Sequence, residues 1–382
     1  MARIVMAGAG LAGRLFAWAL GRAGHEVLVF DAAQGPAPSF DGTGAAAFTA
    51  AGMLSPLAEQ EQGGAQVAAW GWRSLALWPA IVAALPTPVP FRREGSLLLA
   101  HRSDLGAAQR ALARMPGAVP LDPAGLQGLE PELLPGLQGW LLPGEGQIAP
   151  VAAMVGLWAG TGASGVQPVQ GVQPVQWHWG CAVAEVHPRG LVLQDGRRWA
   201  GDWAIDTRGL GASPTLPVRG VRGEIVTLGL PSHGLRRPLR LLHPRHRVYL
   251  VPRTADEIAV GASEIESEDR SPVSLRSAVE LMAAAHSVMP ALAEARILRM
   301  DRHLRPALPD NLPLAHCEPG LVRLNGLYRH GWLLAPALVE AMLMEAGLGP
   351  LVPADRHPTN LPAAFNNPCS AVRAPQKHHH DA

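Results

Sequence analysis

The sequence predicts an α/β protein in which a split Rossmann-like domain carries an inserted domain built on a mixed or antiparallel sheet. Its opening, up to Asp31, reads as a strand, a glycine-rich turn, a helix and a second strand, which is the order of a dinucleotide-binding unit. Residues typical of strands outside that unit begin at Phe91. Further predicted strands, one of which ends at a glycine turn, appear only after Gly180. A contiguous nucleotide-binding domain would instead continue with more β-α units.

The glycine-rich turn has the spacing that a bound dinucleotide needs. Residues 3–7 are mostly apolar and lead into Gly8-Ala9-Gly10-Leu11-Ala12-Gly13. Gly8 permits the tight turn, Gly10 lets a pyrophosphate approach the backbone, and Gly13 lets the helix pack closely on the sheet. The start of that helix attracts the phosphates, and Asp31 can accept hydrogen bonds from the ribose hydroxyls.

The composition of the chain argues against nucleic acid and membranes as partners. The 382 residues can form two domains, and the formal net charge of +1 gives no field suited to nucleic acid or to a membrane surface. No apolar run is long enough to cross a membrane without glycine, proline or charge, so we expect no membrane span and a small-molecule partner. The only lysine is Lys377, which excludes mechanisms that need an interior lysine amine.

Cysteine usage and the N-terminal run bear on location. The three cysteines are odd in number and far apart, which argues against a disulfide framework, and none has metal-ligand spacing, so no metal is expected. The alternative interpretation of the opening is a secretory signal peptide. Arg14, Arg22 and three glycines interrupt its apolar run, so we expect a cytoplasmic protein.

The remaining elements follow in order along the chain. The segment Ala50 to Pro56 is too apolar for solvent and reads as a buried backbone approach to something flat, and the tandem hexapeptide of residues 165–176 reads as a loop duplication. Helices are predicted near residues 70–85, 274–288 and 331–346, and strands near 91–100, 182–186, 191–194, 203–206, 248–252 and 257–262. The predicted dinucleotide-binding domain comprises 1–85, 148–218 and 299–350, the substrate domain 86–147 and 219–298, and a flexible tail 351–382.

Five segments, in this order, resemble the glycine oxidases of thiamine biosynthesis, within the D-amino-acid oxidase and sarcosine oxidase superfamily of FAD enzymes. The resemblance covers about residues 1–346, and the order of five segments is more specific than any single motif. The segments are Gly8 to Gly13 with Asp31; Ala50 to Leu54; Arg219 to Glu224; Tyr249 to Arg253 with Val260 to Ala262; and Leu304 to Pro306 with Asp310 to Pro313 and Gly326 to Pro336.

The resemblance implies a reaction and its partners. It implies non-covalent FAD and oxidative deamination of glycine or a similar small amino acid, with dioxygen as acceptor, hydrogen peroxide as product and hand-off of the imine to a thiazole synthase. It also implies that Arg305 clamps the substrate carboxylate, that Tyr249 helps to hold it, and that Arg329 is a second active-site arginine.

The resemblance also implies a set of cofactor contacts. Gly52 would leave room for the planar flavin, Val183 would offer its backbone to the adenine side, and the helix after Gly331 would point its positive end at the flavin. The complete set is Gly8, Gly10, Leu11, Ala12, Gly13, Asp31, Ala32, Ala51, Gly52, Met53, Val183, Gly209, Leu327, Tyr328, His330, Gly331, Trp332 and Leu333.

Two departures from the family pattern keep alternatives open. Leu327 stands where relatives usually carry histidine, and His330 where they usually carry asparagine or aspartate. The alternatives are a related flavin amine oxidase or dehydrogenase acting on sarcosine, D-amino acids or proline-like compounds, a catalytically silent flavoprotein subunit, and a protein that binds NAD instead of FAD. The oligomeric state is left open, a homo-oligomer included.

Overall fold

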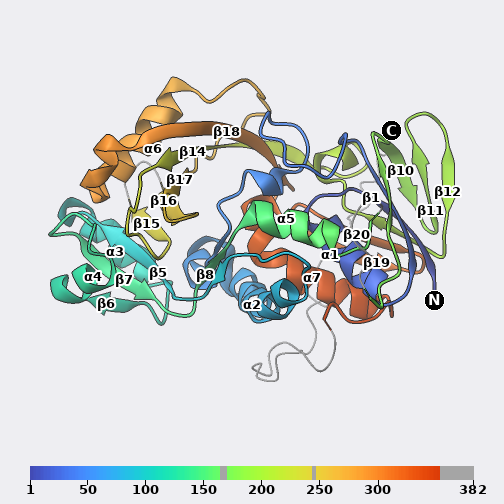
Figure 1. Ribbon diagram of the computed structural model, residues 1–382, viewed down its shortest axis with the longest axis horizontal. Coiled ribbons are helices and arrows are strands. Elements are labelled where there is room, and N and C mark those ends of the chain that lie inside the picture. Colours follow the sequence, from blue (N-terminus) through green and yellow to red (C-terminus); the bar gives the residue numbers. More distant parts are fainter. Residues whose placement is uncertain (164–169, 243–246, 353–382) are drawn as a thin grey trace, which may run out of the picture.

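A six-stranded sheet carries the glycine-rich turn. The computed structural model describes residues 1–163, 170–242 and 247–352. The strand order is β19-β20-β13-β1-β2-β9, parallel except for the antiparallel edge strand β19 (Figure 1). Its strands are β1 (Arg3–Ala7), β2 (Glu26–Asp31), β9 (Gln176–Trp179), β13 (Trp203–Asp206), β19 (Leu314–Glu318) and β20 (Leu321–Asn325). They come from the beginning, middle and end of the chain, as a split Rossmann-like domain requires.

Four helices pack with this sheet into one apolar core. They are α1 (Leu11–Arg22), α2 (Pro56–Ala83), α5 (Pro150–Ala159) and α7 (Gly331–Glu345). The side chains of Leu15, Trp18, Trp78 and Leu334 are fully buried in that core. Helix α2 begins earlier than the predicted helix near residue 70, because Pro56 stands in its first turn and its backbone is bent at Gly64, which has φ of 72°.

An eight-stranded sheet forms the second layer, in the order β18-β14-β17-β16-β15-β5-β7-β6. Helix α6 (Leu275–Val288) packs on one of its faces, and α3 (Leu105–Leu112) and α4 (Pro123–Leu129) lie near its far edge (Figure 1). The strands are β5 (Ser96–Ala100), β6 (Val119–Leu121), β7 (Gln138–Leu142), β14 (Arg219–Gly229), β15 (Leu239–Leu242), β16 (Arg247–Pro252), β17 (Glu257–Gly261) and β18 (Arg296–Ala307). Strand β18 stays in this sheet beyond the predicted domain boundary at residue 299, and the domain ranges otherwise remain a prediction.

Two small antiparallel sheets and five short 3-10 helices complete the described chain. One sheet comprises β3 (Met53–Leu54), β8 (Gly146–Ile148) and β4 (Phe91–Arg92), and the other β10 (Val183–His187), β11 (Gly190–Leu193) and β12 (Arg198–Ala200). The 3-10 helices are η1 (Ala46–Phe48), η2 (Arg102–Asp104), η3 (Gly209–Ala212), η4 (Pro290–Glu294) and η5 (Tyr328–His330).

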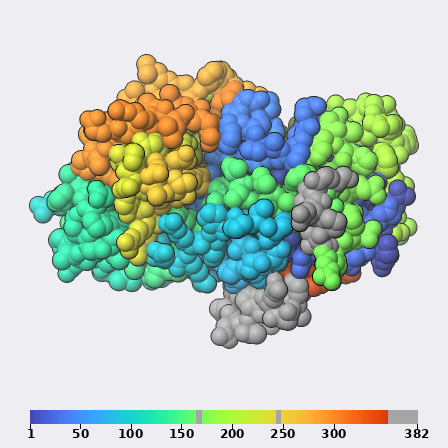
Figure 2. All heavy atoms as spheres, in the orientation of Figure 1, coloured from blue at the N-terminus to red at the C-terminus, as the bar shows by residue number. Residues whose placement is uncertain are grey.

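The segment between β2 and η1 joins the two large sheets. Arg302 Nη1 donates to the Phe40 carbonyl at 3.3 Å, and Arg270 Nη1 donates to the Gly42 carbonyl at 2.8 Å. Figure 2 shows this blue segment between the orange residues around β18 and the yellow-green residues around β10 to β12. The segment therefore forms part of the wall between the sheets.

Some predictions fall outside the described residues. They concern the tail from residue 353 onward and residues 165–169, which are most of the first hexapeptide copy. Within the described residues, every helix is too short or too polar to span a bilayer.

Candidate active site

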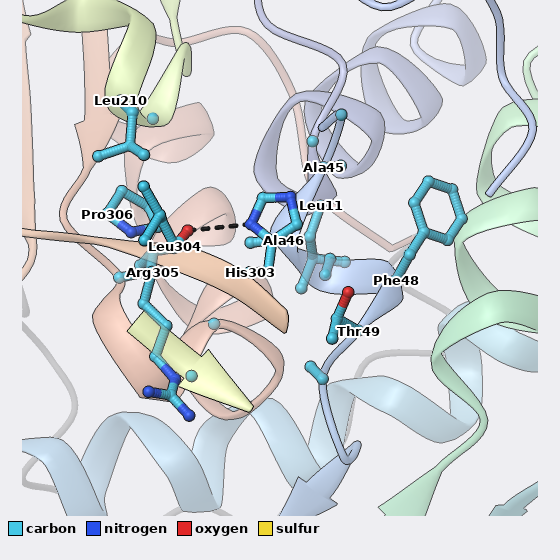
Figure 3. Close-up of a pocket in the computed structure, with 18 of the residues that line it drawn as sticks. Leu11, Ala45, Ala46, Phe48, Thr49, Leu210, His303, Leu304, Arg305 and Pro306 are labelled. Atoms are coloured by element: carbon cyan, nitrogen blue, oxygen red, sulfur yellow. Dashed lines mark hydrogen bonds between the residues drawn. The ribbon is translucent and has the colours of Figure 1, made fainter. Parts of the chain in front are cut away.

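One large cavity lies where the two main sheets meet. Its volume is about 1620 Å³, larger than the roughly 300–1,000 Å³ of typical small-molecule sites, so it has room for a dinucleotide together with a small substrate. All of the predicted site residues line it except Gly13. Figure 3 shows the His303 ring beside Leu11 and Ala46, and the Arg305 side chain extending from the same strand in another direction. Sequence positions more than 300 residues apart therefore meet at one site.

The glycine turn has the shape that its spacing predicts. Gly8 has φ of +102°, and a Cβ there would lie 2.5 Å from the Thr207 carbonyl oxygen. A Cβ at Gly13 would lie 2.0 Å from the Gly8 carbonyl oxygen, so Gly13 acts in helix packing, away from the cavity. A Cβ at Gly10 would have no neighbour within 4 Å, which leaves the cavity side of the turn open to a ligand.

Asp31 has a structural role in addition to the predicted one. Its carboxylate accepts a hydrogen bond from the Ala9 N–H at 2.6 Å and another from the Ala33 N–H at 2.8 Å. The side chain thereby fixes the glycine turn against the end of β2. Contact with a ribose stays a prediction for this residue.

Two helices begin at the cavity. Neither Gly10 before α1 nor His330 before α7 caps its helix with a side-chain hydrogen bond. A Cβ at Gly331 would have no neighbour within 4 Å, so the start of α7 is as open as the start of α1. Unpaired N–H groups at both helix starts favour negative charge. The residues present therefore fit a dinucleotide with an anionic pyrophosphate.

Gly52 has a structural role in addition to the predicted one, which stays a prediction. Its φ is +72°, and a Cβ there would lie 2.1 Å from the Ile148 carbonyl oxygen. The close approach to β8 already requires glycine, whatever lies on the cavity side. Arg253 Nη2 donates to the neighbouring Ala50 carbonyl at 2.7 Å and fixes the same segment.

We expect Gly52→Ala to destabilise the fold more than Gly24→Ala does. Both glycines have positive φ, but a Cβ at Gly24 would have no neighbour within 4 Å. Left-handed backbone alone costs alanine about 1–2 kcal/mol, and the clash at Gly52 adds about 1–3 kcal/mol more. Urea unfolding of both variants checks this, and equal losses of unfolding free energy would contradict the steric account.

Arg305 lies on the cavity side of the eight-stranded sheet without an acidic partner. Its Nη1 and Nη2 each donate to the Ser263 carbonyl at 3.1 Å. Among the carboxylates of the described chain, none forms an ion pair with it. The guanidinium lies against Gly223 of the neighbouring strand, where a Cβ would be 2.3 Å from Arg305 Cζ. Its hydrogen-bond acceptors are neutral backbone carbonyls, so its positive charge is not neutralised. A guanidinium in this state is suited to bind a carboxylate.

Tyr249 lies beside Arg305 and, like it, lies against a glycine of the neighbouring strand. A Cβ at Gly261, directly across from Tyr249 on β17, would lie 2.6 Å from the Tyr249 hydroxyl. Burial raises the pKa of Tyr249, although the charge of Arg305 opposes this. The hydroxyl thus remains protonated at neutral pH and can donate a hydrogen bond to a ligand.

Arg329 differs from Arg305 because its charge is already neutralised. Its Nη2 lies 2.8 Å from Glu59 Oε2, and its Nη1 lies 3.3 Å from Glu264 Oε2. Glu59 also accepts a hydrogen bond from Arg240 at 2.8 Å. Burial opposes ionisation of Glu59, but Arg240, His330 and Arg329 together lower its pKa to about 2. The catalytic assignment of Arg329 stays a prediction, and the geometry gives this side chain a place in a buried ion-pair cluster.

His330 belongs to the same cluster. Its Nδ1 lies 3.5 Å from Glu59 Oε2, and burial lowers its pKa to about 4 despite the neighbouring Glu59 charge. Arg329 Nε donates to His330 Nε2 at 3.5 Å, which places the imidazole proton on Nδ1. His330 is therefore neutral at pH 7, and the start of α7 carries no imidazolium.

The low pKa of His330 predicts loss of stability in mild acid. The ordinary histidine pKa is 6.5, so the unfolded chain takes up this proton before the folded chain does as pH falls. The free energy of unfolding contributed by His330 is complete above about pH 6.5 and decreases by up to about 3 kcal/mol as pH falls to about 4.

The measurement is the pH dependence of urea unfolding in wild type and His330→Asn. Because burial also lowers the pKa of His303, the informative quantity is the difference between the two slopes. We expect the variant to show a shallower decrease between pH 6.5 and 4. Parallel curves would show that His330 does not titrate in this way.

Several contributors to the site carry weak signals in the sequence. Gly223 and Gly261 lie in segments that mark the resemblance, but their contact with a side chain depends on strand register. Glu59 is followed directly by Gln60 and Glu61, so its sequence neighbourhood does not mark it, whereas Arg14 is an isolated charge inside an apolar helix. That isolated charge is the available signal for Arg14.

Comparison with known proteins places this chain in a family. The family model described as "FAD dependent oxidoreductase" (DAO) matches residues 3–342. The chain is 36% identical over 351 residues, 90% of this chain and 98% of the relative, to ThiO of Rhizobium etli, named a thiamine biosynthesis oxidoreductase. It is 33% identical over 144 residues, 36% of this chain and 22% of the relative, to a bifunctional protein ThiO/ThiG of a Nostoc species.

A solved structure gives the same result for the fold. The glycine oxidase of Geobacillus kaustophilus superposes with a TM-score of 0.76 at 20% identity, over 95% of this chain and 100% of that one. The predicted resemblance and the predicted fold class are both confirmed. The chain belongs to the FAD-dependent oxidoreductase family, and FAD is its cofactor.

Proposed function

We propose that this protein oxidatively deaminates glycine or a similarly small amino acid, with dioxygen as electron acceptor and hydrogen peroxide as product. The observation that carries the proposal is the pairing of Arg305 with Tyr249 in the FAD cavity. Arg305 is a cation with no acidic partner in the described chain, and Tyr249 supplies a protonated hydroxyl beside it. A guanidinium fork binds a carboxylate through two parallel hydrogen bonds.

The residues around that pair determine how the substrate is held. Arg305 fixes the carboxylate, which sets the position of the amine-bearing carbon in the cavity. Bound FAD would supply the hydride acceptor for that carbon and the route for the electrons to dioxygen. Arg329 and Arg240 share Glu59, and Arg329 also pairs with Glu264, so these four side chains together carry no net charge. The start of α7 at Gly331 contributes a positive dipole end that stabilises negative charge on a bound group.

A role in thiamine biosynthesis is part of the proposal. It is supported by the ThiO relative of Rhizobium etli, which matches along almost its whole length. The Nostoc protein whose name joins ThiO to ThiG supports hand-off of the imine product to a thiazole synthase. An unstable imine favours a consumer that acts close to its source. The three site assignments, Arg305, Tyr249 and Arg329, belong to the same proposal.

Anaerobic addition of glycine to the purified yellow protein tests the proposal. We expect the flavin absorbance near 450 nm to bleach and, on admission of air, to recover with release of one hydrogen peroxide per cycle. Sarcosine, D-alanine and D-proline are measured in parallel. Rapid bleaching by a bulky D-amino acid but not by glycine would overturn the substrate, and an absorbance that no amine bleaches would favour a silent flavoprotein.

A further inference from the structure

A buried arginine lies directly behind the glycine turn. Arg14, in the first turn of α1, is 1% exposed and contributes to the wall of the FAD cavity. Its Nε donates to the Ala9 carbonyl at 2.9 Å, its Nη1 to the Met154 carbonyl at 2.8 Å and its Nη2 to the Pro36 carbonyl at 3.0 Å. One side chain thus joins the glycine turn, helix α5 and the segment after β2.

The charge of Arg14 has no direct counter-charge in the protein. In the described part of the chain, no carboxylate lies within ion-pair distance of it, whereas buried arginines are normally paired. The Phe48 and Trp179 rings lie 5.2 Å and 5.9 Å from its Cζ and contribute only weak cation-π attraction. Burial lowers the pKa of Arg14 to about 10, against the opposing effect of Asp31, so the side chain is still protonated at neutral pH.

The position of this cation matches the place where a dinucleotide carries its charge. Gly10 and the open start of α1 mark the anion-binding end of the cavity. Arg14 also binds the Ala9 carbonyl, and Asp31 accepts a hydrogen bond from the Ala9 N–H in the preceding peptide group. The backbone of the turn is therefore fixed from both directions before any ligand binds.

We propose that Arg14 is the counter-charge for the FAD pyrophosphate and the positioning residue of the glycine turn. The two phosphates supply the negative charge that the protein itself does not place beside the guanidinium. This inference rests on FAD being the cofactor and not on which amine is oxidised.

The test measures release of FAD from the full-length, FAD-loaded protein. FAD fluorescence after dilution gives its dissociation constant, and competition with ADP or adenosine separates the pyrophosphate from the nucleoside. Arg14→Met removes the charge while retaining most of the side-chain length. Arg22→Met is the matched control, because Arg22 is at the other end of α1 and is not part of the cavity wall.

We expect Arg14→Met to raise the dissociation constants of FAD and ADP about tenfold to a hundredfold, the range for loss of a charged partner. The dissociation constant of adenosine should change less than twofold. Arg14→Lys, which keeps the charge but not the three hydrogen bonds, should lie between wild type and Arg14→Met. Arg22→Met should match wild type for all three ligands.

Equal weakening of ADP and adenosine would overturn the proposal, since it would show general damage to the site, and so would unchanged affinity for ADP. If Arg14→Met does not retain FAD, the ratio of ADP to adenosine affinity in Arg14→Gln decides, because glutamine removes the charge but keeps an N–H donor, and a purely structural role leaves that ratio at its wild-type value. No amine substrate enters these measurements, so an error in the proposed substrate cannot alter their outcome.

Discussion

Replacing Arg305 with alanine is expected to lower kcat/KM for glycine about 30-fold to 5,000-fold. The physical reason is the loss of the partner for a desolvated carboxylate, which typically costs about 2–5 kcal/mol. The value is obtained from steady-state peroxide release and from anaerobic flavin reduction. Because Arg305 also sets the orientation of the reacting carbon, we expect both KM and kcat to change.

Two comparisons make this result specific. Arg296→Ala removes an exposed arginine from the same strand and should leave kcat/KM unchanged. Glycine ethyl ester lacks the carboxylate, so it should be a poor substrate of the wild type and should lose little further activity in Arg305→Ala. If the variant lost equal activity toward glycine and the ester while keeping its flavin spectrum, Arg305 would not be the carboxylate anchor.

The fold could be predicted from the sequence because its signals are local and ordered. The glycine turn, Asp31 and the strand at Trp203–Asp206 are each defined within a few residues, and their order along the chain indicates a split sheet. The helix predicted near residues 70–85 begins too late, because Pro56 and the bend at Gly64 conceal the start of α2 in a segment that reads as irregular. Local signals thus gave the elements but not every boundary.

The site was only partly predictable, for a reason of geometry. Arg305 could be identified as a candidate from its segment, but whether an arginine is free or paired depends on residues far away in sequence. Arg329 is held by Glu59, 270 positions earlier, and the sequence alone gives no sign of that pairing. The same limit applies to Gly52, whose need for glycine comes from Ile148 on another strand.

The register between β14 and β18 leads to a second prediction, which concerns Gly223. A methyl group added there would overlap the Arg305 guanidinium, since its Cβ would lie 2.3 Å from Cζ and 2.3 Å from Nη2. We therefore expect Gly223→Ala to displace the guanidinium and to lower kcat/KM for glycine at least tenfold, with FAD still bound. The strand should tolerate alanine, because Gly223 has ordinary extended backbone within β14 and carries no positive φ.

A double-mutant cycle separates an effect through Arg305 from general damage. Gly229→Ala, at the far end of the same strand, is the control, because its Cβ would meet only the exposed side chain of Leu298, at 3.1 Å, which can move aside. If Gly223 acts by seating the guanidinium, then Gly223→Ala should have almost no further effect in the Arg305→Ala background, so the two losses are strongly non-additive. Additive losses would mean that the methyl group disturbs the sheet or the cavity directly. Arg305 lies against Gly223 and donates to backbone carbonyls, with no ion-pair partner among the described residues. Non-additivity would therefore also explain how this fold keeps a cation at the cavity wall and still leaves its charge available to the substrate.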